Sequence, residues 1–250
     1  MAFGNDFYDL IAADYDSMTR FSRRLESERE MLRRWHERYS FNSVLDAACG
    51  TGLHAVVLAQ LGLKTTGADP ARAMLDEAHR HAVEASVDVT FLESDFKSLP
   101  SRLADRFEAV LVLGNSLPHV LQQEELHASL EGLAGVLKKG GILVLQLLNY
   151  DRILKTKERI VGITRDQNKY FVRFYDFLDG VVQFNILTFS TDEKGISHRL
   201  TSTLLKPYRL TDLEQALSAV KLGNIETFGN MNFSPYDPAS SPNLVVVARS

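Results

Sequence analysis

Hydrophobic residues recur at helical spacing in one long stretch near the start of the chain. Phe21, Leu25, Leu32, Trp35 and Tyr39 repeat at intervals of three, four or seven, with charged residues between them, which predicts one amphipathic helix. Six arginines in this stretch resemble a nucleic-acid-binding stripe, but four glutamates alternate with them. A solvated, salt-bridged helix face is therefore the better interpretation.

From residue 44 onward, short apolar blocks alternate with helical patterns. The sequence predicts strands at 43–49, 64–69, 88–94, 107–114 and 141–148, and helices at 53–62, 70–82 and 124–139. We expect Pro70 to start the second of these helices and Gly140 and Gly141 to close the third. Strands that alternate with helices imply a parallel, doubly wound α/β sheet with both faces covered. Ligands of such sheets bind at the carboxyl ends of the strands.

The segment 159–206 breaks this alternation, since it contains no convincing helix. Asp179-Gly180 is a two-residue turn signal between two runs rich in aromatic and β-branched residues, and a loop at 192–195 leads to a third run. We predict an inserted antiparallel meander here, which forms a substrate cap. The remainder, 1–158 and 207–250, would form one cofactor-binding domain.

The last part of the chain returns to the alternating pattern. Thr211 and Glu214 form a capping-box signature for a helix that reaches about Lys221, and Gly223 would end it. Two final strands are predicted near 225–229 and 243–249, separated by the turn-rich stretch 230–242.

Composition narrows the class of protein. The 250 residues include 28 basic and 32 acidic side chains, for a net charge of −4, and 45% are apolar. This size supports a substantial core, while the mild acidity argues against broad capture of nucleic acid. No apolar run approaches the roughly 20 residues that cross a bilayer. The single cysteine, Cys49, and the lack of a secretory leader pattern favour a reducing, cytoplasmic location.

The turn after the first predicted strand carries the strongest chemical signal. In the stretch Asp46-Ala47-Ala48-Cys49-Gly50-Thr51-Gly52, the two glycines allow a tight turn and close approach of the backbone to a ligand, beside free N–H groups at a helix start. With Ala55 the pattern also matches the dinucleotide fingerprint Gly-x-Gly-x-x-Ala. A plain tight turn is the alternative interpretation. Cys49 is more consistent with packing than with nucleophilic chemistry.

Two acidic residues at strand ends sharpen this prediction. Asp69 closes the second strand, where a carboxylate can accept hydrogen bonds from both ribose hydroxyls. Asp95 closes the third strand and offers an acceptor for an exocyclic amine, with Phe96 beside it to cover a base. Each alone could be the cap of the next helix. Together after a glycine turn they favour a nucleoside-containing cofactor.

On these residues the sequence resembles the class I S-adenosylmethionine-dependent methyltransferases. The matching motifs are FYDLIAADYD, VLDAACGTG, GADPARAML, FLESDF, VLVLGNSLPHV and LKKGGILVLQLLNYDRIL. Within that superfamily, GNSLPHV followed by NYDRIL is most similar to the glycine N-methyltransferase and glycine/sarcosine methyltransferase group. The resemblance implies a seven-stranded Rossmann-like sheet whose last strand is antiparallel. It also implies S-adenosyl-L-methionine as cofactor and S-adenosyl-L-homocysteine as product.

The resemblance also assigns site residues. The glycine turn would hold the methionine part of the cofactor, Asp69 the ribose, and Asp95 and Phe96 the adenine. Met74 would pack near the nucleoside. The cofactor-binding set predicted in this way is Tyr15, Ala48, Gly50, Thr51, Gly52, Asp69, Pro70, Met74, Asp95, Phe96, Leu113, Asn115 and His119.

Methyl transfer from a sulfonium depends chiefly on alignment of the nucleophile, and no covalent protein intermediate is required. A neutral amine acceptor needs orientation and a route for its proton, whereas a hydroxyl or carbon acid usually needs a general base. His119 is our candidate for the base or orienting group, with contact to the cofactor as the alternative. Asn149 and Tyr150 complete the predicted catalytic set, and no metal site is predicted.

One position departs from the glycine-specific enzymes. They carry an arginine just before the Asn-Tyr-Asp motif, which clamps the acceptor carboxylate, and here that residue is Leu148. Arg173 or Arg199 in the insert could replace it, although exposed strand arginines are usually solubilising. Glycine is therefore a weak prediction for the acceptor. Aromatic residues of the insert could form a lid, with core packing as the alternative for at least half of them: Tyr170, Phe171, Phe174 and Tyr175.

The sequence thus predicts a methyltransferase that acts on a small-molecule acceptor, most favourably at nitrogen, without a nucleic-acid or membrane partner. An oxygen or carbon acceptor is the near alternative. An NAD(P)-dependent oxidoreductase and a cofactor-binding module without catalysis are the more distant ones.

Overall fold

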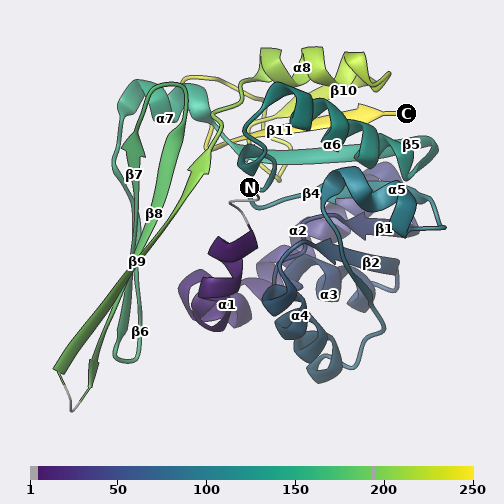
Figure 1. Ribbon diagram of the computed structural model, residues 1–250. Helices are drawn as coiled ribbons and strands as arrows, with labels where there is room; N and C mark the ends of the chain where they lie inside the picture. Colours follow the sequence, from purple (N-terminus) through teal and green to yellow (C-terminus); the bar gives the residue numbers. More distant parts are fainter. Residues whose placement is uncertain (1–4, 193–194) are drawn as a thin grey trace.

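A seven-stranded sheet with helices on both faces forms the larger part of the protein, as seen in a computed structural model that describes residues 5–192 and 195–250 (Figure 1). The strand order is β10-β11-β5-β4-β1-β2-β3. The strands β1 (Ser43–Asp46), β2 (Lys64–Asp69), β3 (Thr90–Glu93), β4 (Phe107–Val112) and β5 (Leu137–Leu148) are parallel, whereas β11 (Asn243–Arg249) runs antiparallel to both β5 and β10 (Gly223–Phe228). The fold class predicted from the sequence is confirmed.

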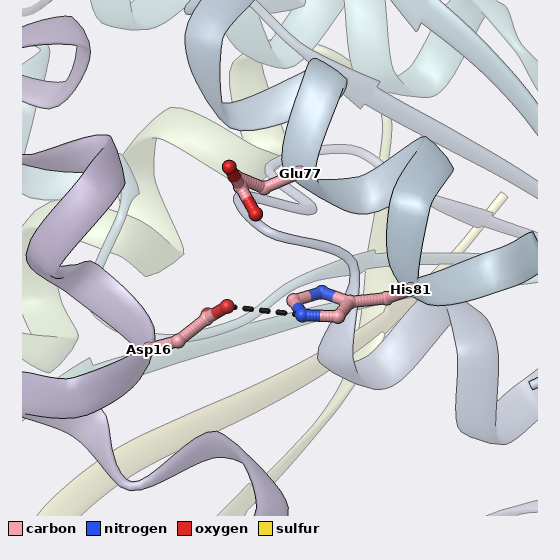
Figure 2. A group of neighbouring side chains, drawn as sticks. All are labelled: Asp16, Glu77 and His81. Carbon is pink, nitrogen blue, oxygen red and sulfur yellow. Dashed lines mark ion pairs between the residues drawn. The ribbon is translucent and has the colours of Figure 1, made fainter. Parts of the chain in front are cut away.

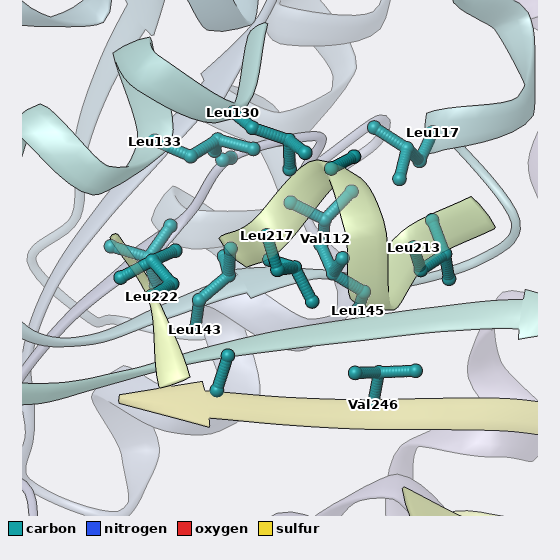
Figure 3. Close-up of a cluster of buried hydrophobic side chains, with 14 of the residues drawn as sticks. Val112, Leu117, Leu130, Leu133, Leu143, Leu145, Leu213, Leu217, Leu222 and Val246 are labelled. Carbon is teal, nitrogen blue, oxygen red and sulfur yellow. The ribbon is translucent and has the colours of Figure 1, made fainter. Parts of the chain in front are cut away.

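Alternate side chains of the central strands point to opposite faces and enter two separate cores. On one face, helices α6 (Gln123–Gly135) and α8 (Leu210–Ala219) cover a cluster of leucines and valines that includes Val112, Leu145 and Val246 (Figure 3). On the other face, α2 (Phe21–Tyr39) and α3 (Leu53–Gln60) pack their apolar sides on Val44, Leu111 and Val245. The sheet is thus buried on both sides, as parallel sheets require.

A second sheet of four antiparallel strands stands beside the first (Figure 1), in the order β6-β7-β8-β9. Its strands are β6 (Ile160–Asp166), β7 (Lys169–Phe177), β8 (Val182–Asp192) and β9 (Gly195–Leu205). The turn between β7 and β8 is at Asp179-Gly180, where Gly180 has φ 69°. Residues 193–194, within the predicted loop at 192–195, lie outside the described residues.

One strand and several helices were not predicted from the pattern. Helix α1 (Asn5–Thr19) precedes the predicted amphipathic helix, and a left-handed Arg20 with φ 58° separates the two. Strand β6 adds a fourth strand to the three that were predicted in the insert, at the edge of the second sheet. Helix α7 (Tyr150–Thr156) follows β5 directly.

The predicted boundary between the third helix and the strand after it was wrong, and Gly140 and Gly141 lie inside β5 instead of closing the helix. The helix predicted to run to residue 139 ends at Gly135, because Leu137 already pairs with Phe107 of β4, and a bulge follows before regular pairing resumes at Ile142. Gly141 is required there, since a Cβ atom would lie 2.9 Å from the carbonyl oxygen of Lys138.

The capping box predicted for the last helix involves different residues. Asp212 rather than Glu214 reaches back to a backbone N–H, which belongs to Arg209 at 2.8 Å. The helix consequently begins one residue before Thr211. Among residues 5–192 and 195–250, no helix is long and apolar enough to cross a membrane.

Candidate active site

A cavity of about 520 Å³ opens where β1, β2, β3 and β4 end. Because parallel strands present their carboxyl ends at one edge, the loops after these strands meet around this space. Helix α1, the start of α2 and strand β9 close the remaining sides. The core sheet, the N-terminal helices and the second sheet thus share one cavity, whose volume is typical of small-molecule sites.

The glycine turn forms the floor of this cavity. Gly50 and Gly52 have φ 54° and 86°, which side-chain-bearing residues rarely adopt. A Cβ atom on Gly50 would meet no atom within 4 Å, so the backbone is open to the cavity there, whereas Gly52 abuts Ala78 of α4 (Arg72–Glu84). The first glycine therefore leaves room for a ligand, and the second allows close packing of α4.

Asp69 ties the glycine turn to the turn after β2. Its Oδ2 accepts a hydrogen bond from the Gly50 N–H at 2.9 Å, and its Oδ1 accepts one from the Ala71 N–H, also at 2.9 Å. Burial raises the pKa of Asp69 to about 6, while these two amides oppose the rise. Each oxygen keeps a further lone pair that can accept a hydrogen bond from a ligand hydroxyl.

Asp95 has the capping role considered for it and also lies at the cavity. Its Oδ1 accepts the Ser98 N–H at 2.9 Å and so caps the 3₁₀ helix η1 (Phe96–Ser98), which continues into α5 (Leu99–Arg102). The residue also lines the cavity together with Phe96. The capping bond holds the side chain of Asp95 at the cavity wall, beside the ring of Phe96.

His119, at the end of the 3₁₀ helix η2 (Leu117–His119), joins three parts of the chain. Its Nε2 lies 3.0 Å from the Tyr8 hydroxyl on α1, and its Nδ1 lies 3.4 Å from the Thr203 hydroxyl on β9. Burial lowers the pKa of His119 to about 4, so the ring is neutral near pH 7. One ring nitrogen of the neutral form donates and the other accepts, and a hydroxyl group can complement either.

Ten of the predicted cofactor-binding residues line the cavity: Tyr15, Ala48, Gly50, Thr51, Asp69, Pro70, Asp95, Phe96, Leu113 and His119. Gly52, Met74 and Asn115 do not. Met74 is fully buried against α1 and the second sheet. Asn115 uses its amide oxygen to accept the Leu148 N–H at 2.9 Å and its amide nitrogen to donate to the Tyr150 hydroxyl at 3.0 Å.

Two residues of the predicted catalytic set lie away from the cavity wall. The Asn149 amide nitrogen donates to the carbonyl oxygens of Pro238 and Ser241 at 3.0 and 2.9 Å, and its oxygen caps α7. Tyr150 is 1% exposed and packs in a cluster with Tyr175. Both side chains fix the end of β5 against neighbouring segments and do not line the cavity.

Side chains that were not among the predicted site residues also line the cavity, including Tyr8, Arg24, His54, Gln122, Glu125 and Thr203. The Arg24 guanidinium is held by Glu28 at 2.8 Å, and Glu28 also lies 3.3 Å from His54. The charge pairing predicted for this helix face is therefore confirmed, and it also holds the Arg24 guanidinium at the cavity. Cys49 is buried beside Gly50, and burial raises its thiol pKa, which fits a packing role.

Behind the glycine turn, His81 connects α4 to α1. His81 Nδ1 lies 2.8 Å from the Thr51 carbonyl oxygen, and Nε2 lies 3.0 Å from Asp16 Oδ2, with Glu77 nearby (Figure 2). The Arg80 guanidinium approaches Glu77 at 2.6 Å and His81 at 3.0 Å. The Arg80 guanidinium thus brings a positive charge to this group of side chains, which links α1 to α4.

Comparison with known proteins agrees with this geometry. A family model described as a methyltransferase domain matches residues 44–141. The chain is 28% identical to the glycine/sarcosine N-methyltransferase of Aphanothece halophytica over 230 residues, which cover 90% of this chain and 83% of that enzyme. It is 33% identical to the enzyme of that name from Parasynechococcus marenigrum (strain WH8102) over 141 residues, 56% of this chain and 50% of that enzyme.

Among solved structures, an S-adenosylmethionine-dependent methyltransferase from Clostridium acetobutylicum superposes with a TM-score of 0.81 at 18% identity, over 97% of this chain and 98% of that one. This likeness shows a shared fold. The match to the methyltransferase-domain model and to these relatives shows that the protein is an S-adenosylmethionine-dependent methyltransferase. Within that class, it is homologous to the glycine/sarcosine N-methyltransferases.

The residues of the cavity suit this cofactor. The open space beside Gly50 would accommodate its amino-acid part, the free lone pairs of Asp69 would suit two ribose hydroxyls, and Arg24 would pair with its carboxylate. When bound, the cofactor supplies a methyl group on a positively charged sulfur. The chain's own part is to bind and align the two reactants and to exclude water.

Proposed function

We propose that the protein transfers a methyl group to a nitrogen atom of a small-molecule acceptor. The observation that carries this proposal is the neutral, doubly hydrogen-bonded His119 at the cavity wall. A hydroxyl or carbon acid would call for a general base with a pKa near 7, and the pKa of His119 is about 4. An amine in its neutral form already has the lone pair that attacks, so a weakly basic orienting group suffices.

In this proposal His119, Tyr8 and Thr203 orient the acceptor nitrogen toward the methyl group. The acceptor nitrogen would supply the electron pair of the new N–C bond, and the cofactor would supply the methyl group, its sulfur keeping the electron pair of the C–S bond. The surplus proton of the acceptor leaves to solvent along the hydrogen-bonded hydroxyls. Homology to N-methyltransferases supports the choice of nitrogen over oxygen or carbon.

We also propose that residues 159–206 act as a substrate cap on a methyltransferase domain formed by 1–158 and 207–250. Thr203 of β9 lines the cavity, and Phe171 and Tyr175 of β7 face inward and are buried. Tyr170 alternates to the other face, where it stacks on Phe189. Only half of the predicted aromatic lid is therefore directed at the core of the protein. A small-molecule acceptor and a cytoplasmic location remain predictions from the sequence.

The test combines binding with turnover. Calorimetry should show that S-adenosylhomocysteine binds and NAD does not, and a panel of amines, phenols and carbon acids should give methylated product with amines. Binding of NAD alone, or methylation confined to hydroxyl or carbon acceptors, would contradict the proposal.

The His119→Ala variant tests the orienting role. We expect a loss of at least 100-fold in kcat and a change of less than threefold in the Kd of S-adenosylhomocysteine, because the ring acts on the acceptor side. His127→Ala is the matched control, since His127 lies half-exposed on α6 and outside the cavity lining. Equal losses in kcat and in cofactor affinity would instead assign His119 to cofactor binding.

A further inference from the structure

The second sheet has an apolar face that is turned away from the rest of the protein. Its inner face packs on α1, where Lys169 and Arg199 both contact Asp14. Phe171 on this inner face is fully buried. Because successive residues of a strand point to opposite sides, the residues that alternate with these form the outer face. The apolar members of the outer face come from all four strands: Ile160, Ile163, Tyr170, Val172, Phe174, Leu187, Phe189, Ile196 and Leu200.

A row of four aliphatic side chains crosses the whole outer face. Val172 of β7 pairs with Ile163 of β6 on one side and with Leu187 of β8 on the other. Leu187 in turn pairs with Leu200 of β9. The Cβ atoms of opposite residues lie about 4.5 to 5.5 Å apart, so the row is continuous. Ile163 and Leu200, at its two ends, are 65% and 57% exposed.

Aromatic rings flank this row, and arginines lie at the margin of the outer face. Tyr170 and Phe189 stack on one side of the row with 4.9 Å between their ring centroids, and Phe174 lies on the other side. The guanidinium of Arg165 lies 5.3 Å from the centroid of the Tyr170 ring, and that of Arg159 lies 5.5 Å from the centroid of the Phe174 ring. An apolar centre that contains aromatic rings, with charged groups at the rim, is typical of protein–protein interfaces.

The size of the outer face matches one half of a dimer interface. The four strands contain 7, 9, 11 and 11 residues. At about 3.4 Å per residue and about 4.8 Å between strands, they present a flat area of about 600 Å². Side chains that stand out from the sheet raise the accessible area above this figure, and a stable interface buries about 800 Å² on each partner. Apolar surfaces of more than a few hundred Å² mark interaction sites.

A second copy of the chain is the occupant that fits this face best. A twofold axis through the face places the aliphatic row of one copy against that of the other, so the apolar surface is complementary to itself. Two sheets that pack in this way lie about 10 Å apart with interdigitated side chains. A membrane surface fits less well, because the net charge of the chain is −4 and cell membranes carry anionic lipids. We propose that the outer face of the second sheet is the interface of a homodimer in which the sheets of two copies pack face to face.

Sedimentation velocity from about 1 to about 100 µM tests the proposal. Wild type should be dimeric with a Kd below about 10 µM, since interfaces of this size give micromolar or tighter affinities. Ile163→Glu and Leu200→Glu should each raise the Kd of the dimer by at least 100-fold, because each change places two carboxylates in the buried interface. Val83→Glu is the matched control on α4, where Val83 is 78% exposed, and should leave the Kd of the dimer unchanged.

Two further measurements separate loss of the interface from loss of the fold. The melting temperature and the Kd of S-adenosylhomocysteine should be the same for both glutamate variants as for wild type. Cross-linking with a short bis-maleimide reports the face that is used, because Cys49, the single cysteine, is buried. Leu187→Cys on the outer face should join two copies, whereas Ser197→Cys on the inner face of β9 should not.

Three results would overturn the proposed dimer. The first is wild type that stays monomeric at about 100 µM. The second is a dimer whose Kd neither glutamate variant changes. The third is cross-linking at Ser197→Cys and not at Leu187→Cys, which would indicate pairing through the edge of β9. Wild type that stays monomeric and sediments with vesicles of phosphatidylcholine and phosphatidylglycerol would instead assign the outer face to a lipid surface.

Discussion

Asp69 illustrates how one side chain can serve both the fold and the ligand. Its two oxygens hold the backbone N–H groups of Gly50 and Ala71, which fixes the spacing of two loops at the cavity floor. The residue type and its place at a strand end were predictable from the sequence. Its bond to Gly50 was not, because that partner is a backbone atom of another turn.

Removal of the Asp69 carboxylate should weaken cofactor binding. For Asp69→Ala we expect a loss of about 1.5 to 3 kcal/mol in the binding free energy of S-adenosylhomocysteine, the usual range for hydrogen bonds to a charged group. Calorimetric titration measures this directly. An unchanged dissociation constant in a folded variant would rule out the ribose-binding role.

Asp46 provides a second test at the scale of one residue. It is 0% exposed, and burial raises its pKa to about 6, against about 3.9 in an unfolded chain. Because the folded pKa is the higher one, the folded state loses stability as pH rises from about 4 to 6. Above pH 6 the loss of unfolding free energy is complete, and it amounts to about 3 kcal/mol for a pKa shift of about two units.

Asp46→Asn removes this ionisation. Relative to wild type, the variant should gain up to about 3 kcal/mol of unfolding free energy between pH 4 and pH 7.5. Urea unfolding of both proteins at the two pH values gives the difference. If variant and wild type differ in unfolding free energy by the same amount at both pH values, the ionisation of Asp46 does not destabilise the folded state.

Among the elements, α2 matches its sequence pattern most closely, because its apolar stripe is continuous and regular. Trp35 is 1% exposed in the core between α2 and the sheet, and its indole N–H donates to the Met231 carbonyl oxygen at 2.8 Å. The contact with Met231 joins the first helices to the loop before β11, which lies some 200 residues later.

Trp35→Ala should therefore lower the unfolding free energy by about 3 to 5 kcal/mol, the range for large-to-small changes of buried aromatic residues. Denaturant unfolding at constant pH measures the loss. Val83→Ala on α4 is the matched control and should change stability by less than about 0.5 kcal/mol, since Val83 is 78% exposed. A loss below about 1 kcal/mol for Trp35→Ala would mean that the site collapses around the missing ring.

Elements that the pattern did not reveal depend on pairing with other strands. Strand β6 has exposed Ile160 and Ile163 and an interrupting Gly162, so it lacks the alternation of a half-buried strand. Its pairing with β7 defines it. Likewise, the sequence predicts a helix for the residues after Gly135, but these residues pair with β4 and belong to β5. Tertiary pairing overrides local propensity in both places.

At the scale of the whole molecule, α1 is held between the core and the second sheet. Asp14 on α1 contacts Lys169 of β7 at 2.5 Å and Arg199 of β9 at 3.2 Å, while Asp16 contacts His81 on α4. Tyr8 and Tyr15 on the same helix line the cavity. The closure of the active site by α1 therefore depends on polar contacts with the second sheet and with α4.

Asp14→Asn should loosen the attachment of α1 to the second sheet with little effect on global stability. We expect at least a fivefold increase in amide hydrogen exchange within residues 5–19, and a change in unfolding free energy below about 1 kcal/mol, since partly exposed ion pairs contribute little. Asp105→Asn, which removes an exposed pair with Lys64 far from α1, is the control. Unchanged exchange in α1 would show that other contacts hold the helix.

The sequence by itself determined the doubly wound sheet, the glycine turn, Asp69, Asp95 and the methyltransferase class. These features depend on local patterns: apolar blocks, turns that require glycine, and acidic residues at strand ends. Only the tertiary structure decided which side chains face the cavity. It placed Tyr8 and Thr203 against His119 and turned Asn149 away from the cavity, because side-chain direction follows from the packing of distant segments against one another.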